Sequence, residues 1–99
     1  MGGAIYAVGG LDDGTCYDTV ERYDHACDKW TFVSSMNVRR GGVGVTALNG
    51  NLYAVGGNDG SSSLNRCEKY DPIMNRWTAI ATMERPRAGA GLTVLDGFV

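Results

Sequence analysis

The sequence predicts an all-β protein made of repeated four-stranded antiparallel sheets. Two observations lead to this fold class. The 99-residue chain matches itself without gaps when it is shifted by 47 residues, so that the segments Tyr6–Gly10 and Tyr53–Gly57, both YAVGG, coincide. Its apolar runs are short, rich in Val, Tyr, Trp and Thr, and interrupted about every 8–12 residues by Gly, Asn, Asp or Ser. A repeat of this length, made of short strand-like runs separated by turn residues, indicates the blades of a β-propeller.

One complete period supplies four strands in order. We expect the first strand at Gly42–Leu48 and a turn at Asn49-Gly50, because Asn-Gly is the strongest short hairpin signal. The second strand then follows at Asn51–Val55. The third strand is predicted near Arg66–Tyr70 and the fourth, after an Asp-Pro turn, near Arg76–Ile80.

The repeats are offset by one strand relative to the ends of the sequence. Residues 1–36 are predicted to form a repeat without its first strand, and residues 37–83 a complete repeat. Residues 84–99 then supply the first strand of a further repeat, at 89–95. Because each propeller blade packs on its neighbours, two blades cannot close a ring, and we expect either additional blades or self-association.

Large side chains at equivalent places in the two copies are expected to form the core. Trp30 and Trp77 fall on the fourth strand, and Tyr23 and Tyr70 on the third, where they would fill the space between blades. Small residues are expected where the inner strands converge. These are Gly42, Gly44, Gly89 and Gly91.

The acidic residues of the third strand are expected to have structural roles. Glu21 and Glu68 would pair with an arginine or a turn amide, because charged groups are rarely buried alone. Asp24 and Asp71 would close the following turn through bonds to backbone amides.

The glycine pairs Gly9-Gly10 and Gly56-Gly57 are interpreted as strand ends that need tight turns and close packing. A phosphate-binding loop would require a following helix and a Lys-Ser or Lys-Thr, whereas these pairs lead into Leu-Asp-Asp and Asn-Asp. Acidic side chains at that place would repel a phosphate group.

Composition argues against several classes of function. The net charge is −2 and the longest basic run is Arg39-Arg40, so nucleic acid is not an expected partner. No signal peptide or long apolar segment is evident, and the expected location is the cytoplasm. The three cysteines, Cys16, Cys27 and Cys67, form no CxxC pair, and His25 is the only histidine. We therefore expect reduced thiols and no metal site. A redox-sensing role for Cys27, beside Lys29, is the alternative.

The two copies resemble the kelch repeat. The resemblance rests on a double glycine, a Glu-x-Tyr-Asp stretch about ten residues later and a Trp six residues beyond that aspartate, all present twice. The Met-x-x-x-Arg-x-Gly-x-Gly links at 36–44 and 83–91 are similar to those of kelch-like proteins. The resemblance implies a propeller of usually six blades. In kelch-like proteins BTB and BACK domains precede the propeller, and the protein is a substrate receptor of cullin-3 ubiquitin ligases. Other kelch proteins bind actin.

Catalysis is not expected. The family includes a copper radical oxidase, whose metal site needs several histidines and tyrosines, and this sequence has one histidine. No nucleophile elbow or Ser-His-Asp set is present, and no cofactor is expected. The aspartates that follow the glycine pairs are interpreted first as exposed loop residues.

The resemblance therefore implies a protein–protein interaction module that binds a partner peptide of acidic or mixed charge. On a propeller, the loops after the second strand and the links between blades share one face. In some family members the link arginine points into the central pocket, where its fork can bind carboxylates. The alternative for Arg40 and Arg87 is pairing with a neighbouring blade's Glu or backbone carbonyls, and Arg39 and Arg85 could be solvated. The predicted partner-binding residues are Arg40, Arg87, Asp12, Asp13, Asn58, Asp59, Ser62, Ser63, Asn37 and Arg39.

Overall fold

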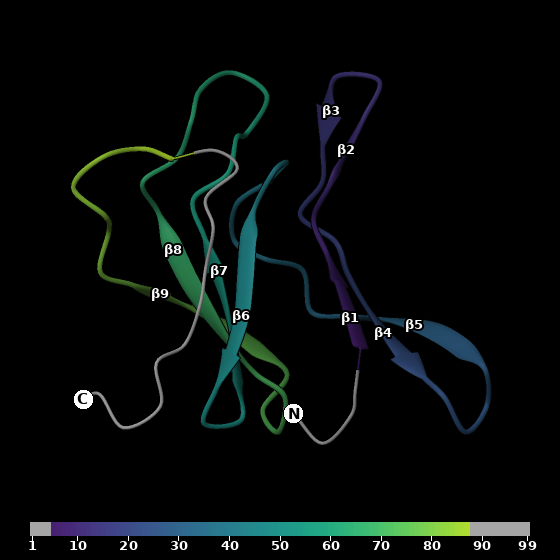
Figure 1. Cartoon of the computed structure of the whole chain (residues 1–99). Helices are drawn as coiled ribbons and strands as arrows, with labels where there is room; N and C mark the ends of the chain where they lie inside the picture. Colours follow the sequence, from purple (N-terminus) through teal and green to yellow (C-terminus); the bar gives the residue numbers. More distant parts are fainter. Residues whose placement is uncertain (1–4, 88–99) are drawn as a thin grey trace.

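The computed structural model describes residues 5–87, which form two packed antiparallel sheets and one small hairpin (Figure 1). The first sheet has the order β1-β4-β5 and the second the order β6-β7-β8-β9. The strands of the described residues are β1 (Ile5–Val8), β2 (Leu11–Asp12), β3 (Thr15–Cys16), β4 (Val20–Asp24), β5 (Lys29–Val33), β6 (Gly44–Leu48), β7 (Asn51–Val55), β8 (Cys67–Asp71) and β9 (Arg76–Ile80). Within residues 5–87 there is no helix long and apolar enough to cross a membrane.

The second sheet confirms the predicted four-stranded blade. β7 and β9 have the expected bounds, β8 is displaced by one residue, and β6 begins at Gly44 rather than Gly42. The chain before Gly44 does not pair with β7, because Gly41 pairs instead with Asn58 in an isolated bridge. The first sheet contains the three expected strands, and the further strand expected at 89–95 lies outside the described residues.

Turn chemistry explains the connections. Asn49 and Gly50 both have positive φ, 51° and 82°, as the predicted two-residue hairpin requires. Asp24 Oδ1 accepts bonds from the amides of Ala26 and Cys27, and Asp71 Oδ1 from those of Ile73 and Met74, which confirms their predicted roles. The carboxylate of Asp24 has a lowered pKa because the amides of Ala26 and Cys27 stabilise its charged form.

The β2–β3 hairpin was not predicted, because residues 11–17 were expected to form a loop. Leu11 pairs with Cys16 and Asp12 with Thr15, and the turn between them has positive φ at Asp13 (47°) and Gly14 (79°). Asp-Gly is a recognised hairpin signal. The strands on either side of it have only two residues each, too few to show a strand pattern in the sequence.

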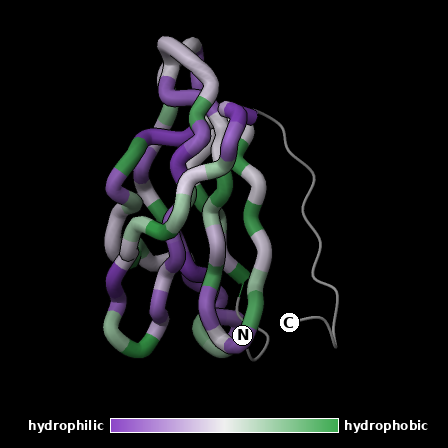
Figure 2. The backbone as a smooth tube through the Cα atoms, turned by 90° about the vertical axis from the view of Figure 1, so that its left-hand side faces the viewer, coloured by the Kyte–Doolittle hydropathy of each residue, from purple (hydrophilic) through white to green (hydrophobic). Residues whose placement is uncertain are grey.

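The core lies between the two sheets. It contains Val20, Met36, Leu52, Ala54, Tyr70 and Trp77, with Tyr6, Val8, Val33 and Val43 packed against it. Figure 2 shows hydrophobic and hydrophilic residues in alternating short stretches along the chain, as expected for strands with one face in this core. The predicted core roles of Tyr70 and Trp77 are confirmed. Trp30, by contrast, is 48% exposed and packs beside Tyr23 on the side of the first sheet that faces away from the core.

Each glycine pair allows a link between blades to pass close to the end of the second strand. Gly9 has φ +61°, and a Cβ there would overlap the carbonyl oxygen of Arg40. The next amide, that of Gly10, donates a hydrogen bond to the same oxygen (2.9 Å). Gly56 (φ +65°) and Gly57 repeat both features with the carbonyl of Arg87. The interpretation of the pairs as tight turns with close packing is confirmed.

Replacing Gly9 by alanine should therefore destabilise the fold more than the same change at Gly14. Gly14 also has positive φ (79°), but a Cβ there would meet no atom within 4 Å, so only the left-handed backbone is penalised, by roughly 1–2 kcal/mol. At Gly9 the overlap adds about 1–3 kcal/mol. Urea unfolding of the two variants measures the difference. Equal losses would show that the link does not need this close approach.

Candidate functional site

The loops expected to bind a partner lie at one end of the two sheets. Figure 1 shows the β2–β3 hairpin and the loop between β7 and β8 at the top of the view, near the link that joins the sheets. The hairpin follows β1 of the first sheet, and the other loop connects β7 and β8 of the second, so a surface between them is formed by both repeats.

A groove of about 380 Å³ lies between the hairpin and the β7–β8 loop. Its walls come from both elements and its base from the link. Leu11 is 65% exposed beside it, whereas Cys16 is buried. The lining residues are Leu11, Gly14, Cys16, Gly41, Gly42, Asn58 and Gly60.

Backbone hydrogen bonds hold the second wall in place. Gly41 and Asn58 exchange both of their amide–carbonyl bonds, at 2.7 and 2.8 Å. Asn58 Oδ1 also accepts a bond from the amide of Gly60 (2.6 Å). A Cβ on Gly41 would lie 2.9 Å from Cys16 Sγ, so the link, the hairpin and the loop meet closely at this glycine. The groove is therefore preformed rather than built from free loops.

Asp59 shapes the loop that carries this wall. Its Oδ1 accepts bonds from the amides of Ser61 (2.9 Å) and Ser62 (3.0 Å). These amides lower the pKa of the Asp59 carboxyl, because they stabilise the charged form. The side chains of Ser62 and Ser63 are exposed next to it. Asp59 thus has a structural role in addition to the predicted role in binding.

Arg40 requires a correction, because the structure buries the side chain that was predicted to contact a partner. Arg40 is 1% exposed, and its Nε and Nη2 donate to Glu68 Oε2 at 3.2 and 3.0 Å. Its Nη1 donates to the carbonyls of Gly56 and Arg66, both at 2.7 Å. The structural alternative therefore holds for Arg40, and the expected pairing of Glu68 with an arginine is confirmed.

Asn37, an exposed residue of the link, also binds Glu68. Its amide and its Nδ2 donate to Glu68 Oε1, at 2.9 and 3.2 Å, so its polar groups are directed to the second sheet rather than to a partner. Together with Arg40, it satisfies both oxygens of the carboxylate. Within residues 5–87, no buried side-chain nitrogen or oxygen lacks a hydrogen-bond partner.

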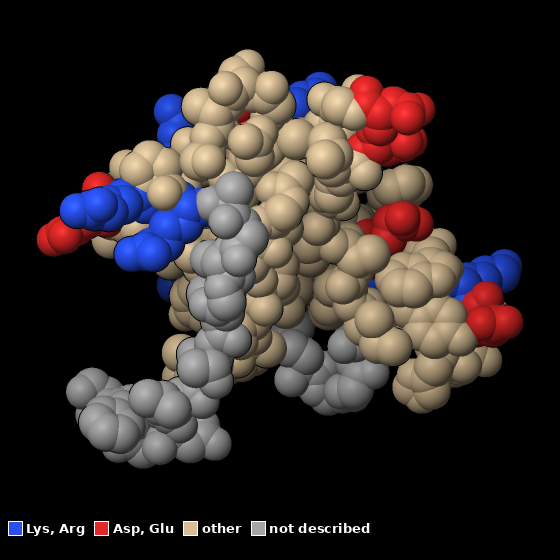
Figure 3. Space-filling model, turned by 45° about the horizontal axis from the view of Figure 1, so that its top comes forward, with Lys and Arg blue, Asp and Glu red and all other residues tan. Residues whose placement is uncertain are grey.

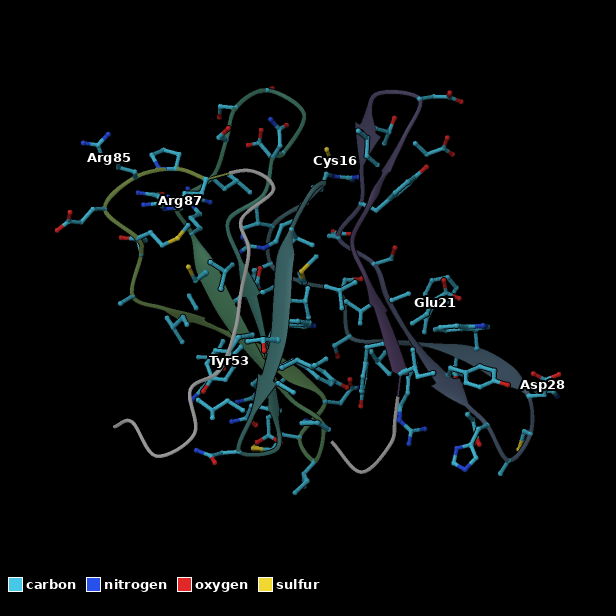
Figure 4. All side chains as sticks on the ribbon, viewed as in Figure 1. Cys16, Glu21, Asp28, Tyr53, Arg85 and Arg87 are labelled. Carbon is cyan, nitrogen blue, oxygen red and sulfur yellow. The ribbon has the colours of Figure 1, made fainter. Side chains whose placement is uncertain are left out.

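The remaining predicted residues stay at the surface. Asp12 and Asp13 are exposed on the hairpin, and Asp12 Oδ2 accepts a long bond from the Tyr17 hydroxyl (3.4 Å). Arg39 is exposed, and its Nη1 donates to the carbonyl of Cys16 (3.3 Å), which places a positive charge beside the groove. Arg87 is exposed in the link after β9. Figure 4 shows Arg85 and Arg87 on the side of the molecule opposite to the first sheet.

Of the ten residues predicted to bind a partner, only Asn58 lines the groove, and the apolar residues of the hairpin wall were missed. Leu11, Cys16 and Gly41 carried no chemical signal of their own, and they line the groove only because the hairpin forms. Among residues 5–87 no group of three His, Cys, Asp or Glu side chains is placed to hold a metal ion. All three cysteines are free thiols, with Cys16 and Cys67 buried and Cys27 exposed.

Comparison with known proteins gives two findings. The family model described as the Kelch motif matches residues 1–37 and 39–84. A solved structure titled "Structure of YjhT" is similar over 91% of this chain, with 27% sequence identity and a TM-score of 0.69. The match covers 31% of that protein, so the present chain corresponds to about a third of its length.

Removing one member of the buried ion pair should be strongly destabilising. Arg40→Met leaves the Glu68 carboxylate buried with an uncompensated charge, which typically costs about 3–5 kcal/mol. Arg85→Met, at an exposed position of the next link, should change the free energy of unfolding by less than about 0.5 kcal/mol. Chemical denaturation measures both. A loss at Arg40 no larger than at Arg85 would refute the structural role.

The Asp59 loop should loosen in acid. Because its folded pKa is depressed, its contribution is complete above the ordinary aspartate pKa of about 3.9 and is lost as pH falls through the folded pKa. In NMR titrations the amide protons of Ser61 and Ser62 should follow Asp59 with a midpoint below that ordinary value. Asp59→Asn should abolish this titration. A midpoint at or above the ordinary value would contradict the loop geometry.

Proposed function

This chain belongs to the kelch-motif family, and on that premise we propose that it binds an extended segment of a partner protein in the groove between the β2–β3 hairpin and the β7–β8 loop. Kelch repeats generally mediate protein–protein interactions. The observation that carries the proposal is the preformed groove itself, whose two walls come from successive blades and are fixed by the Gly41–Asn58 backbone bonds.

The chemistry of the groove favours a segment of mixed charge. Asp12 and Asp13 on the hairpin suit a basic side chain, and Arg39 beside Cys16 suits an acidic one. Leu11 offers an exposed apolar contact between them. A purely acidic segment is less favoured, because Arg40 is occupied by Glu68 and its fork cannot reach a ligand.

A longer protein that carries these blades would act as a cytoplasmic substrate receptor of a cullin-3 ubiquitin ligase. What supports this role is the similarity of the Met-x-x-x-Arg-x-Gly-x-Gly links to those of kelch-like proteins. Actin binding is the alternative within the family. Co-sedimentation of the chain with actin filaments separates the two: absence from the filament pellet is expected, and saturable co-sedimentation would favour the scaffold role.

Selection of peptides from a random library tests the groove directly. Selected peptides should contain a basic and an apolar residue, and the combined variant Asp12→Asn with Asp13→Asn should bind them at least about tenfold more weakly. Fluorescence anisotropy with a labelled peptide gives the affinity. The loss has a simple cause, since both changes remove negative charge from the hairpin that forms one wall of the groove.

Asp28→Asn is the matched control. Asp28 lies in the β4–β5 turn, away from the groove, and Figure 4 shows it beyond Glu21 at the edge of the first sheet. Its substitution changes charge by the same type of replacement and should leave peptide affinity unchanged. Equal effects of the hairpin variant and the Asp28 variant would reject the groove as the binding site.

A further inference from the structure

A second pocket, of about 500 Å³, lies between the two sheets at the end opposite to the groove. Figure 1 shows the β6–β7 and β8–β9 turns at the bottom of the view, away from the β2–β3 hairpin. The first sheet supplies one wall of this pocket, and the two turns with the end of β8 supply the other, so both walls belong to the described chain. Its volume is typical of ligand pockets. The lining residues are Tyr6, Arg22, Val33, Gly50, Tyr70, Pro72, Ile73 and Asn75.

Hydrogen bonds between the two walls hold the pocket in shape. Asn75 Oδ1 accepts a bond from the Tyr70 hydroxyl (2.7 Å) and one from the amide of Ser34 (3.0 Å). The hydroxyl of Ser34 donates to the carbonyl of Asn75 (2.7 Å). Because Ser34 follows β5 and Asn75 precedes β9, these bonds join the first sheet to the β8–β9 turn. The pocket is therefore preformed.

The polar groups of the pocket are suited to an anion. Within residues 5–87, the guanidinium of Arg22 makes no ion pair or side-chain hydrogen bond, and the hydroxyl of Tyr6 makes no side-chain hydrogen bond. Asn75 uses its Oδ1 for the bonds to the walls, and its Nδ2 is a further donor. Among the described residues that line the pocket, none is Asp or Glu. Donors and a positive charge without an acidic neighbour favour a carboxylate.

Strand register places Arg22 beside the aromatic side chains of the pocket. Arg22 is opposite Tyr6, on the face of the first sheet that carries the core residue Val20. Tyr6 packs edge-on against the buried Tyr70, with the ring centroids 5.9 Å apart. Burial and the neighbouring Tyr6 raise the pKa of the Tyr70 phenol, and the positive charge of Arg22 acts against this rise. Asp24, the next residue on the same face, accepts bonds from the amides of its own turn.

We propose that this pocket binds the C-terminal residue of a partner peptide that ends in an aromatic side chain, with the terminal carboxylate on Arg22. The guanidinium fork can bind a carboxylate through two parallel hydrogen bonds. The aromatic side chain then packs against Tyr6, Val33 and Pro72. A peptide suits the site better than a small free acid, because Ile73 on the rim is 96% exposed and the residues before the C-terminus would cover it.

The pocket differs in charge from the groove at the other end of the molecule. Figure 3, in which the groove end is turned toward the viewer, shows a cluster of acidic side chains at the upper right. Asp12 and Asp13 are exposed acidic residues of the hairpin at that end. A terminal carboxylate is repelled by the hairpin and attracted by Arg22. The pocket and the groove can therefore be tested separately.

A peptide and its amide test the role of the carboxylate. Fluorescence anisotropy with the 99-residue chain measures the affinity of the peptide Gly-Ala-Ala-Phe, labelled at its N-terminus. The free acid should bind at least about tenfold more tightly than the same peptide with a C-terminal amide. Equal affinity of acid and amide would overturn the proposal. Acetyl-phenylalanine should compete less well than the unlabelled peptide, and equal competition would overturn the assignment to a peptide.

Substitution of Arg22 identifies the pocket. Arg22→Met should weaken binding of the free acid at least about tenfold and leave the weak binding of the amide unchanged. Arg85→Met is the matched control, because Arg85 is exposed at the other end of the molecule, as Figure 4 shows. The combined variant Asp12→Asn with Asp13→Asn should also leave the affinity unchanged. Circular dichroism confirms that each variant keeps its sheets. Equal weakening by Arg22→Met and Arg85→Met, or by the hairpin variant, would overturn the pocket as the binding site.

Discussion

The ion pair between Arg40 and Glu68 is the interaction on which the arrangement of the two sheets depends. The carboxylate accepts four hydrogen bonds, two from Arg40 and two from Asn37, and Nη1 of the same arginine also binds the carbonyls of Gly56 and Arg66. Such a charge pair is tolerated in a buried site only when its remaining polar groups are satisfied, as they are here. Because Arg40 belongs to the link and Glu68 to the second sheet, the pair determines how the link crosses from one sheet to the other.

The path of the link also determines the candidate binding groove. The amide of Gly10 donates a hydrogen bond to the Arg40 carbonyl. The amide and the carbonyl of the next residue, Gly41, both bond to the backbone of Asn58. The β2–β3 hairpin and the β7–β8 loop of the second sheet are thereby attached to the same short segment of chain. An arginine whose side chain secures the core thus places, through its backbone, two loops whose exposed side chains are available to a partner.

Sequence alone located most of the strands, but it did not predict the β2–β3 hairpin or the composition of the site. Repeat period, strand punctuation and Asn49-Gly50 located the four strands of the second sheet to within two residues, because each is a local signal. The role of Arg40 could not be decided in the same way, because a carboxylate of a partner and a carboxylate of the neighbouring blade would bind its guanidinium equally well. The structure shows that Glu68 of the second sheet binds it. The hairpin wall of the groove was missed, because Leu11 and Cys16 become neighbours only through a two-residue strand pairing. Trp30 shows a further limit: its residue type predicts burial, but within residues 5–87 it is 48% exposed on the side of the first sheet that faces away from the core.

A double-mutant cycle on Arg40 and Glu68 tests the central claim most directly. Arg40→Met and Glu68→Leu are compared singly and together by the free energy of unfolding, and the coupling is the deviation from additivity. If the pair organises the interface between the sheets, removal of both charges should cost far less than the sum of the single losses, with a coupling energy near the upper end of the range for contacting residues, about 3 kcal/mol. Additive losses, within about 0.5 kcal/mol, would show that the two side chains act independently and would contradict the account.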